Sequence, residues 1–148
     1  MKTVKEVMRK NIPFVSPDDP LKKITKIMRD NNMWGLPVVE KGKIEGIITD
    51  GDMLNLFYLN VSAYSYEEST GRGEETEKFL ERVEEFKNLK VRDVMTMHPR
   101  TVSEKAGVDE AAAMLKRFKI KRLIAVDERG NPVGMVERLN VVDSILSE

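Results

Sequence analysis

Two short apolar runs, at 36–39 and 44–48, dominate the pattern of the first half of the chain. They flank a Lys-Gly turn at 41–42 and are rich in β-branched residues, so they predict a β-hairpin. The second strand leads directly into Thr-Asp-Gly-Asp at 49–52 and then into a helix expected from Met53 to Tyr58. A strand that ends at a helix start exposes free backbone N–H groups beside short polar side chains. Such a corner suits a sugar-phosphate.

The same pattern returns in the second half of the chain. Seven residues recur 87 positions later: Val4, Val7, Met8, Val15, Ser16, Leu36 and Val39 return as Val91, Val94, Met95, Val102, Ser103, Leu123 and Val126. One extra residue in the second turn moves the offset to 88, so that Gly42 and Gly46 correspond to Gly130 and Gly134. Repetition at a fixed spacing is typical of duplicated structural units. We therefore expect a first repeat at 1–59, a linker at 60–88 and a second repeat at 89–148.

Helical and strand periodicities predict the remaining elements of each repeat. In the first repeat they predict a helical turn at 4–9, a strand at 14–15, and a helix with Asp19 as N-cap and Pro20 at its first position, ending near 31–32. In the second repeat they predict, in order, a helical turn at 91–96, a strand at 101–102, a helix at 108–118, strands at 123–126 and 133–136, and a helix at 139–146. Each repeat then reads β-α-β-β-α. The fold class is α+β, with two repeats that share a buried face because each is marginal alone.

The linker divides into a polar part and an amphipathic part. Residues 60–73 are polar and punctuated by glycine, which predicts a loop. Residues 74–86 predict a helix with an apolar side, formed by Phe79, Leu80, Val83 and Phe86. Two interpretations stay open: a linker helix docked on its own repeats, which Tyr58, Tyr64 and Tyr66 help to cover, or a dimer contact or regulatory arm.

Composition narrows the possible functions. The 25 basic and 25 acidic residues cancel, so net charge favours neither nucleic acid nor a bilayer surface as a partner. The chain has no cysteine and a single histidine, which excludes disulfides, thiol catalysis and multi-histidine metal sites. No apolar run reaches the roughly 18 residues of a membrane span, and we expect a soluble, cytoplasmic protein. No glycine-rich phosphate loop or nucleophile elbow occurs either, so we expect no enzymatic activity.

The residues resemble a known family. The motifs Val-Lys-Glu-Val-Met at 4–8 and Val-Arg-Asp-Val-Met-Thr at 91–96, the hairpin Leu-Pro-Val-Val-Glu at 36–40, and Thr-Asp-Gly-Asp at 49–52 are similar to those of the CBS domain, the cystathionine β-synthase type repeat. The resemblance covers nearly the whole chain except about residues 60–88. It implies two repeats packed sheet to sheet about a pseudo-two-fold axis, with two clefts that hold adenosine compounds. It also implies a homodimeric sensor that is not itself a catalyst.

The resemblance implies a first cleft centred on Thr49 and Asp52. In the family, a Ser or Thr followed three positions later by Asp binds ribose and phosphate. Asp52 can accept hydrogen bonds from both ribose hydroxyls, and Thr49 can donate to a phosphate oxygen. The alternative is that Asp50 or Asp52 only caps the helix that follows. The family grips the adenine through the other repeat, which here supplies Met95, Thr96, His98, Arg100, Ile120 and Lys121; for His98, the alternative role is an exposed residue without a function.

A second cleft departs from the family pattern. Glu137 stands where a hydroxyl is expected and Asn140 where the ribose-binding Asp is expected. A carboxylate at this position repels a phosphate, but Lys121 and Arg122 stand where the family places phosphate-binding cations. Trp34 stands where a base can stack, or it is a half-buried hydrophobic residue at the repeat interface. We expect one competent cleft and a second that is degenerate or takes a different ligand.

Three functions follow from these features. The first is a regulatory module that binds AMP, ADP, ATP or S-adenosylmethionine between the repeats and signals through dimer packing to an unidentified protein target; no cofactor or metal is required. The second is a ligand-free dimerisation scaffold. The third is nucleic-acid binding through the basic stretch Lys116, Arg117, Lys119, Lys121 and Arg122, which otherwise is a solvated helix face or attracts phosphate to the clefts. The aromatic interleaving of a nucleic-acid stacking platform is missing, which argues against the third.

Overall fold

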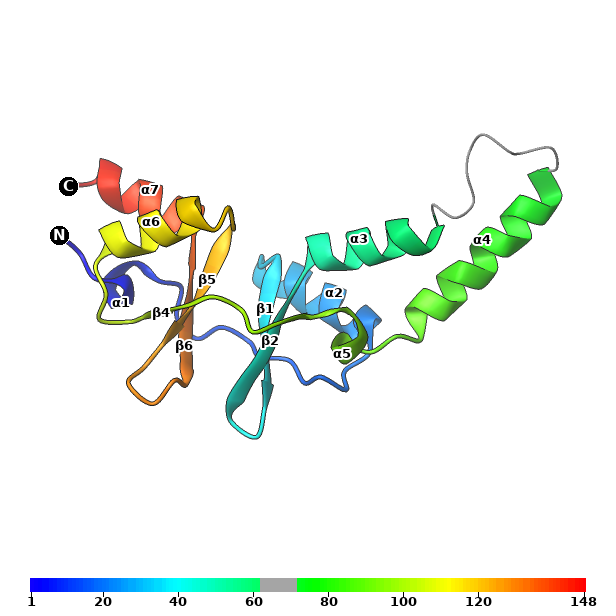
Figure 1. The fold of residues 1–148 in the computed structure, drawn as a ribbon, viewed down its shortest axis with the longest axis horizontal. Coiled ribbons are helices and arrows are strands. Elements are labelled where there is room, and N and C mark those ends of the chain that lie inside the picture. The colour runs from blue at the N-terminus through cyan, green and yellow to red at the C-terminus, as the bar shows by residue number, and fades with distance from the viewer. Residues whose placement is uncertain (62–71) are drawn as a thin grey trace.

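Helices gather along one side of the molecule, and two β-hairpins point to the other side (Figure 1). The computed structural model describes residues 1–61 and 72–148, except for the side chains of 58–61 and 72–76. The hairpins are β1 (Gly35–Glu40) with β2 (Lys43–Thr49), and β5 (Arg122–Val126) with β6 (Pro132–Glu137). The longer helices are α2 (Leu21–Asn31), α3 (Asp50–Val61), α4 (Arg72–Lys87), α6 (Val108–Arg117) and α7 (Arg138–Leu146). The short elements are α1 (Val4–Val7), α5 (Val91–Val94), β3 (Thr96–Met97) and β4 (Thr101–Ser103).

Both hairpins turn at a glycine in the left-handed region. Gly42 has a φ of 78° and Gly130 a φ of 80°, a conformation that costs glycine little and other residues more. The predicted turn at 41–42 is confirmed, and its counterpart in the second repeat also contains a glycine with positive φ. The two turns differ otherwise, because Lys41 has a φ of 51° as well, whereas Gly130 alone has a positive φ in the longer second turn.

Each sheet contains a short segment from the other repeat. The first sheet has the order β1-β2-β3, and β3 comes from the start of the second repeat. The second sheet has the order β4-β5-β6, and Arg9, from the first repeat, pairs with Met135 on β6. The backbone of α1 likewise hydrogen-bonds to Glu104 and Ala106. The two repeats thus exchange their N-terminal segments, which ties them into one body.

The hydrophobic core follows this exchange. Val91 from α5 is fully buried in the cluster that α2 and the first hairpin form, and Val4 from α1 is fully buried in the cluster of the second repeat. Ile124 and Met135, from the second hairpin, also pack into the first cluster. Burial of these side chains supplies the main stabilisation of the junction. The predicted α+β class with two repeats that share a buried face is confirmed.

Several predicted elements differ from the structure. The helix expected from Met53 to Tyr58 is α3, which begins at Asp50 and ends at Val61. The helical turns expected at 4–9 and 91–96 end at Val7 and Val94, because the residues that follow pair with strands of the other repeat. The strand expected at 14–15 is reduced to one bridge between Val15 and Val38. In α2 the N-cap is Pro20, one residue later than expected.

The linker lies partly outside the described residues. Of the loop predicted at 60–73, residues 60–61 belong to α3 and residues 72–73 to α4, so the prediction is wrong at both ends. Residues 62–71, with Tyr64 and Tyr66, lie outside the described residues, as does the side chain of Tyr58. The helix predicted at 74–86 is present as α4. Phe57 of α3 makes edge-on ring contacts with Phe79 and Phe86 of α4, at centroid distances of 5.9 and 5.2 Å. The helix therefore docks on its own first repeat, as one of the two interpretations expects.

Candidate functional site

Thr49 and Asp52 form a reciprocal cap at the start of α3. The Thr49 N–H donates to Asp52 Oδ2 at 3.1 Å, and the Asp52 N–H donates to Thr49 Oγ1 at 2.9 Å. This is the capping arrangement that the alternative interpretation expects. It leaves the Thr49 hydroxyl proton free to donate, and an ionised carboxylate offers about four acceptor positions. Capping and ligand binding are therefore compatible at this pair.

The exchanged segment brings Thr96 to the same place. The Thr96 hydroxyl donates to Asp52 Oδ1 at 3.1 Å, a contact between the two repeats. This approach requires Gly46 on β2, because a Cβ there would lie 2.6 Å from the Thr96 carbonyl oxygen and 3.1 Å from Met95 Sδ. The structure thus brings Thr49, Asp52, Met95 and Thr96 together.

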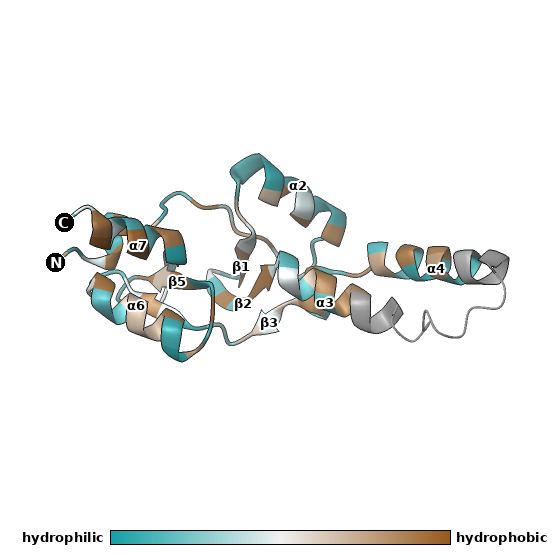
Figure 2. Cartoon of the chain, turned by 90° about the horizontal axis from the view of Figure 1, so that it is seen from above, coloured by the Kyte–Doolittle hydropathy of each residue, from teal (hydrophilic) through white to brown (hydrophobic). Residues whose placement is uncertain are grey.

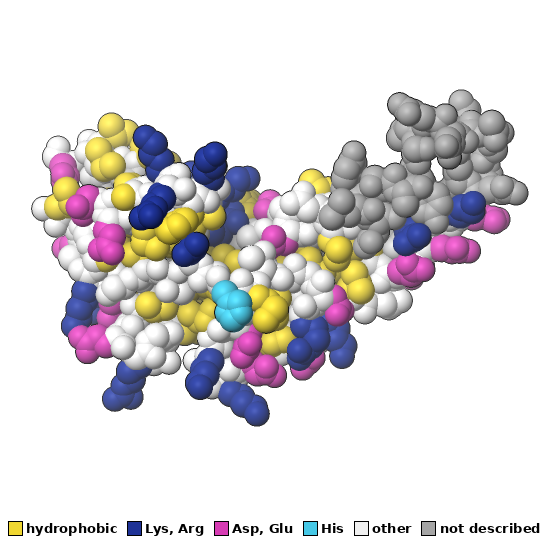
Figure 3. All heavy atoms as spheres, in the orientation of Figure 1, with side chains coloured by type: hydrophobic (Ala, Val, Ile, Leu, Met, Phe, Trp, Pro, Cys, Tyr) yellow, Lys and Arg dark blue, Asp and Glu magenta, His cyan; other side chains and the backbone are white. Residues whose placement is uncertain are grey.

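The other residues expected at the first cleft, His98, Arg100, Ile120 and Lys121, have different surroundings. His98 and Arg100 are exposed, and the Arg100 guanidinium lies 3.9 Å from the ring centroid of Phe118, where it makes a cation–π contact. The histidine is visible at the surface in Figure 3. Ile120 and Lys121 line a groove between α6 and α7. Among the described side chains, Thr96 hydrogen-bonds to Asp52 from the second repeat, and these four residues are not part of that contact.

A cleft of about 570 Å³ lies at the junction of the repeats, on the helix side of the sheets. Its rim is fixed in the same way in both repeats. The Asp50 N–H donates to the Trp34 carbonyl at 3.0 Å, and the Arg138 N–H donates to the Lys121 carbonyl at 3.2 Å. Asp50, the first residue of α3, is thereby held against Trp34, and Arg138, the first residue of α7, against Lys121. The four side chains line the same cleft.

The cleft carries more positive than negative side chains. It is lined by Trp34, Asp50, Lys121, Arg122, Glu137, Arg138, Leu139 and Val142. Three cations face two carboxylates, and the indole of Trp34, 46% exposed, lies at the edge. Such a lining suits a ligand with an anionic end and a flat apolar end.

Arg122 is held in place by close packing on Gly35. A Cβ at Gly35 would lie 2.5 Å from Arg122 Cδ and 2.9 Å from its Nε, so that any larger residue would force the Arg122 side chain to move from this position. The Nε atom is buried and has no hydrogen-bond partner within the described residues. A buried guanidinium N–H without a partner costs free energy, and an anionic acceptor in the cleft would relieve that cost.

Glu137 and Asn140 repeat the cap of the first repeat with altered chemistry. The Glu137 N–H donates to Asn140 Oδ1 at 2.8 Å, which matches the bond from Thr49 to Asp52. Arg9, the counterpart of Thr96, does not approach Asn140; its guanidinium donates instead to the carbonyls of Asn31 and Asn32 at the end of α2. The structure thus places Trp34, Arg122 and Glu137 in one cleft and keeps Asn140 in a cap.

Sequence reasoning did not include Asp50 and Arg138 in a cleft. Both are the first residues of their helices, so their side chains start at the rim. The signal was present in the repeat offset, because Asp50 corresponds to Arg138 as Thr49 corresponds to Glu137.

Two other kinds of site find no support in the described part of the chain. There, His, Asp and Glu side chains do not gather in groups of three or more that could hold a metal ion. None of the helices described is both long and apolar enough to cross a bilayer.

Together, two duplicated α+β units with exchanged N-terminal segments and a charged cleft at their junction define a class of paired-repeat modules. The CBS domain profile matches residues 4–58 and 91–147, so the chain belongs to the CBS domain family and contains a tandem pair of these domains. It is 30% identical over 153 residues to the uncharacterized protein MJ1426 of Methanocaldococcus jannaschii, a match that covers 97% of this chain and 90% of that protein.

Solved structures share the fold. CBSX2, from Arabidopsis thaliana, in complex with AMP superimposes with a TM-score of 0.74 at 24% identity, over 99% of this chain and 98% of that one. The CBS pair of protein MJ0100, in complex with 5-methylthioadenosine and S-adenosyl-L-methionine, gives a TM-score of 0.74 at 21% identity, over 99% and 98% of the two chains. The resemblance to the CBS family and the expected fold are confirmed.

Proposed function

We propose that this CBS pair is a regulatory module that binds an adenosine compound between its repeats and changes how two chains pack. The observation that carries the proposal is the junction cleft, which is lined by the cations Lys121, Arg122 and Arg138 and by the exposed side chain of Trp34. An anionic group can pair with the cations, and a purine can stack on the indole. AMP bound to CBSX2 and S-adenosyl-L-methionine bound to MJ0100 support an adenosyl ligand as the class.

Thr49 and Asp52 do not line this junction cleft. In the proposal they form a separate site with Thr96, for the ribose and phosphate of a nucleotide bound there. The ribose lies at the start of α3, where Asp52 accepts from its hydroxyls and Thr49 donates to a phosphate oxygen. Thr96 reports occupancy across the junction, because its hydroxyl already bonds Asp52 Oδ1 and has to share that carboxylate with the ribose. A ligand acts as a switch only if it prefers one arrangement of the protein, by about 1–3 kcal/mol in typical cases.

The test starts with a thermal-shift screen of AMP, ADP, ATP and S-adenosylmethionine. A ligand at about 100 times its dissociation constant adds about 2.7 kcal/mol to the free energy of unfolding. We expect at least one of the four to raise Tm. If none does, and calorimetry detects no binding, the ligand-free dimerisation scaffold replaces the sensor.

Asp52→Ala is the decisive variant for the ribose site. Loss of hydrogen bonds to a charged acceptor should weaken binding of the ligand found in the screen by about 1.5–3 kcal/mol, roughly ten- to a hundredfold. Because the variant also loses part of the α3 cap, Asp52→Asn, which keeps an oxygen for the Thr49 N–H, separates binding from folding. Asp30→Ala is the matched control, since Asp30 is exposed on α2 and pairs with Lys26. Unchanged affinity in Asp52→Ala removes this residue from the site.

A further inference from the structure

A pocket with mostly apolar walls lies between α2 and α3, and α4 covers one end of it. Its volume is about 580 Å³, and its lining includes three aromatic side chains, Trp34, Phe57 and Phe86, and two methionines, Met28 and Met53. Small-molecule sites in proteins typically have volumes of about 300–1,000 Å³ and apolar walls with a few polar groups. This α2/α3 pocket has both properties.

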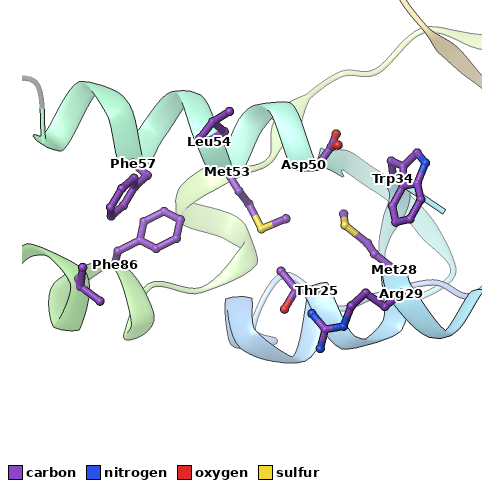
Figure 4. A pocket seen from close by; sticks show the side chains of 10 residues that line it. Thr25, Met28, Arg29, Trp34, Asp50, Met53, Leu54, Phe57 and Phe86 are labelled. Atoms are coloured by element: carbon purple, nitrogen blue, oxygen red, sulfur yellow. The ribbon is translucent and has the colours of Figure 1, made fainter. Parts of the chain in front are cut away.

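Helix α4 covers the pocket without filling it. In Figures 1 and 2, α4 extends outward from the end of α3, away from α6 and α7. Of the described side chains of α4, Val83 and Phe86 line the pocket, and Phe86 meets Phe57 at one end of it (Figure 4). Protein interiors are close-packed, and an empty apolar cavity costs stability in proportion to its volume. A helix with a packing role alone would fill the groove, so the hollow indicates an occupant.

Arg29 is the charged group of the pocket that is available to a ligand. Its side chain is exposed, and its guanidinium has no hydrogen-bond or ion-pair partner among the described residues. Asp50 also lines the pocket, but its carboxylate accepts from the Gly51 N–H at 2.8 Å, and in Figure 4 its oxygens point away from Met28 and Met53. A guanidinium at the edge of an apolar hollow suits a carboxylate on an apolar body.

The size and the flexibility of the lining favour a hydrocarbon chain as that body. A cavity of about 150 Å³ already holds benzene, so this pocket has space for a much longer apolar group. Methionine side chains have three rotatable bonds and adapt to the shape of what they contact. Met28 and Met53, from α2 and α3, can therefore close around a chain that has no fixed shape.

We propose that the α2/α3 pocket binds a medium-chain carboxylate, with the carboxylate at Arg29 and the hydrocarbon chain along Met28, Met53 and Phe57. This is a second ligand site, with a lining far less charged than that of the junction cleft. It goes beyond the proposed nucleotide binding and does not depend on it.

The corresponding groove of the second repeat, between α6 and α7, provides the internal control. Its volume is about 540 Å³, and Ala112 and Lys116 stand there 87 positions after Thr25 and Arg29 of the pocket. Its lining contains no aromatic residue and no residue of α4, but four cations. A carboxylate held by charge alone would therefore prefer this groove, whereas one held by burial of its chain prefers the α2/α3 pocket.

A series of saturated carboxylates measures the binding. Hexanoate, octanoate and decanoate are titrated into the full chain and followed by calorimetry. Burial of each added methylene should tighten binding roughly fourfold, and each step of the series by about fifteenfold. Fluorescence of Trp34, the single tryptophan of the chain, should change with the same affinity, because Trp34 lines the pocket.

Paired variants locate the site. Thr25→Phe fills the pocket and should abolish decanoate binding, whereas Ala112→Phe, at the corresponding position, should leave it unchanged. Arg29→Gln should weaken decanoate binding about tenfold, through loss of charge-assisted hydrogen bonds, and should leave binding of decanol unchanged. Lys116→Gln should change neither. Circular dichroism shows that each variant is folded, and Arg29 is exposed, so its replacement does not disturb the core.

The proposal is overturned if decanoate does not bind the wild-type chain, or if affinity does not rise with chain length. Wild-type affinity in Thr25→Phe or Arg29→Gln also overturns it, and a loss in Ala112→Phe or Lys116→Gln assigns the carboxylate to the α6/α7 groove instead. The nucleotide screen is a separate measurement. Its failure leaves the α2/α3 pocket in place, and failure of the carboxylate series leaves the nucleotide sensor in place.

Discussion

Gly46→Ala tests the exchange of segments that holds the repeats together. A Cβ at Gly46 would lie 2.6 Å from the Thr96 carbonyl oxygen, a separation that Cβ atoms do not adopt, and 3.1 Å from Met95 Sδ. The methionine side chain can move, but the carbonyl belongs to the backbone of β3. Because β3 pairs with β2 over only two residues, Gly46 with Met97 and Ile47 with Thr96, the pairing is readily lost.

Overpacking of a buried position costs about 1–3 kcal/mol. We expect a loss of about 2 kcal/mol in the free energy of unfolding for Gly46→Ala. For a chain of this size, that lowers Tm by roughly 4–8 °C. Circular dichroism or differential scanning calorimetry measures the change, with urea titration as an independent estimate of the same free energy.

The corresponding glycine of the second repeat, Gly134, allows the same test. At Gly134, a Cβ would lie 2.6 Å from Met8 Sδ and 2.7 Å from the Arg9 carbonyl oxygen, so Gly134→Ala should cost about as much. Gly51→Ala is the matched control, because a Cβ there would lie 3.6 Å from Thr49 Oγ1, an ordinary van der Waals contact. Alanine within α3 should leave Tm unchanged or raise it. If Gly46→Ala and Gly51→Ala behave alike, the close approach of the exchanged segments does not exist.

Two further predictions concern the second hairpin and α4. The backbone N–H and the side chain of Asn131 donate to Asp127 and hold the pKa of that carboxyl below its ordinary value of 3.8. Asp127→Ala should therefore lower Tm at neutral pH, and this difference from wild type should disappear as pH falls through the lowered pKa; a difference that persists in strong acid would refute the assignment. Phe57→Ala removes both ring contacts that dock α4, to Phe79 and Phe86, and should speed amide exchange in α4 but not in α6. Unchanged protection of α4 would show that other contacts hold it.

The repeat offset and the strand pattern were sufficient to predict most of the fold. The predicted hairpins and the long helices depend on apolar runs and periodicities of four or more residues, which a sequence displays directly. The first strand of the β-α-β-β-α order was predicted from two residues only, and in the first repeat it is a single bridge. The exchange of segments was not predictable in this way. The paired residues are a two-residue strand at 96–97 and a single residue, Arg9. Segments this short have no period, and their partner is chosen by distant glycines at 46 and 134.

The candidate site was predictable to the extent that it depends on neighbours in sequence. Thr49 and Asp52 meet because they are three positions apart at a helix start. Thr96 was expected beside them on the family resemblance, and the structure places it there through the exchange. The surroundings of Arg100 and Arg122 were not predictable, since these cations lie over Phe118 and Gly35 for reasons of packing.

The differences between the repeats are concentrated at the junction. The closely packed positions have the same residue in both repeats. Gly46 and Gly134 each leave space for a methionine side chain and a backbone carbonyl of the other repeat. Positions at the rim of the cleft share only their backbone hydrogen bonds, and their side chains differ between the repeats. Trp34 corresponds to Lys121, and Asp50 corresponds to Arg138.

A symmetric cleft would present two equal halves, so a ligand could bind in either direction. The first repeat contributes an indole and a carboxylate to the cleft, and the second contributes three cations and one carboxylate. The two directions therefore differ by the attraction between the cations and an anionic group. One cleft built from two diverged halves can therefore fix the direction of a ligand that has one flat apolar end and one anionic end, and this polarity allows binding to favour a single arrangement of the two chains.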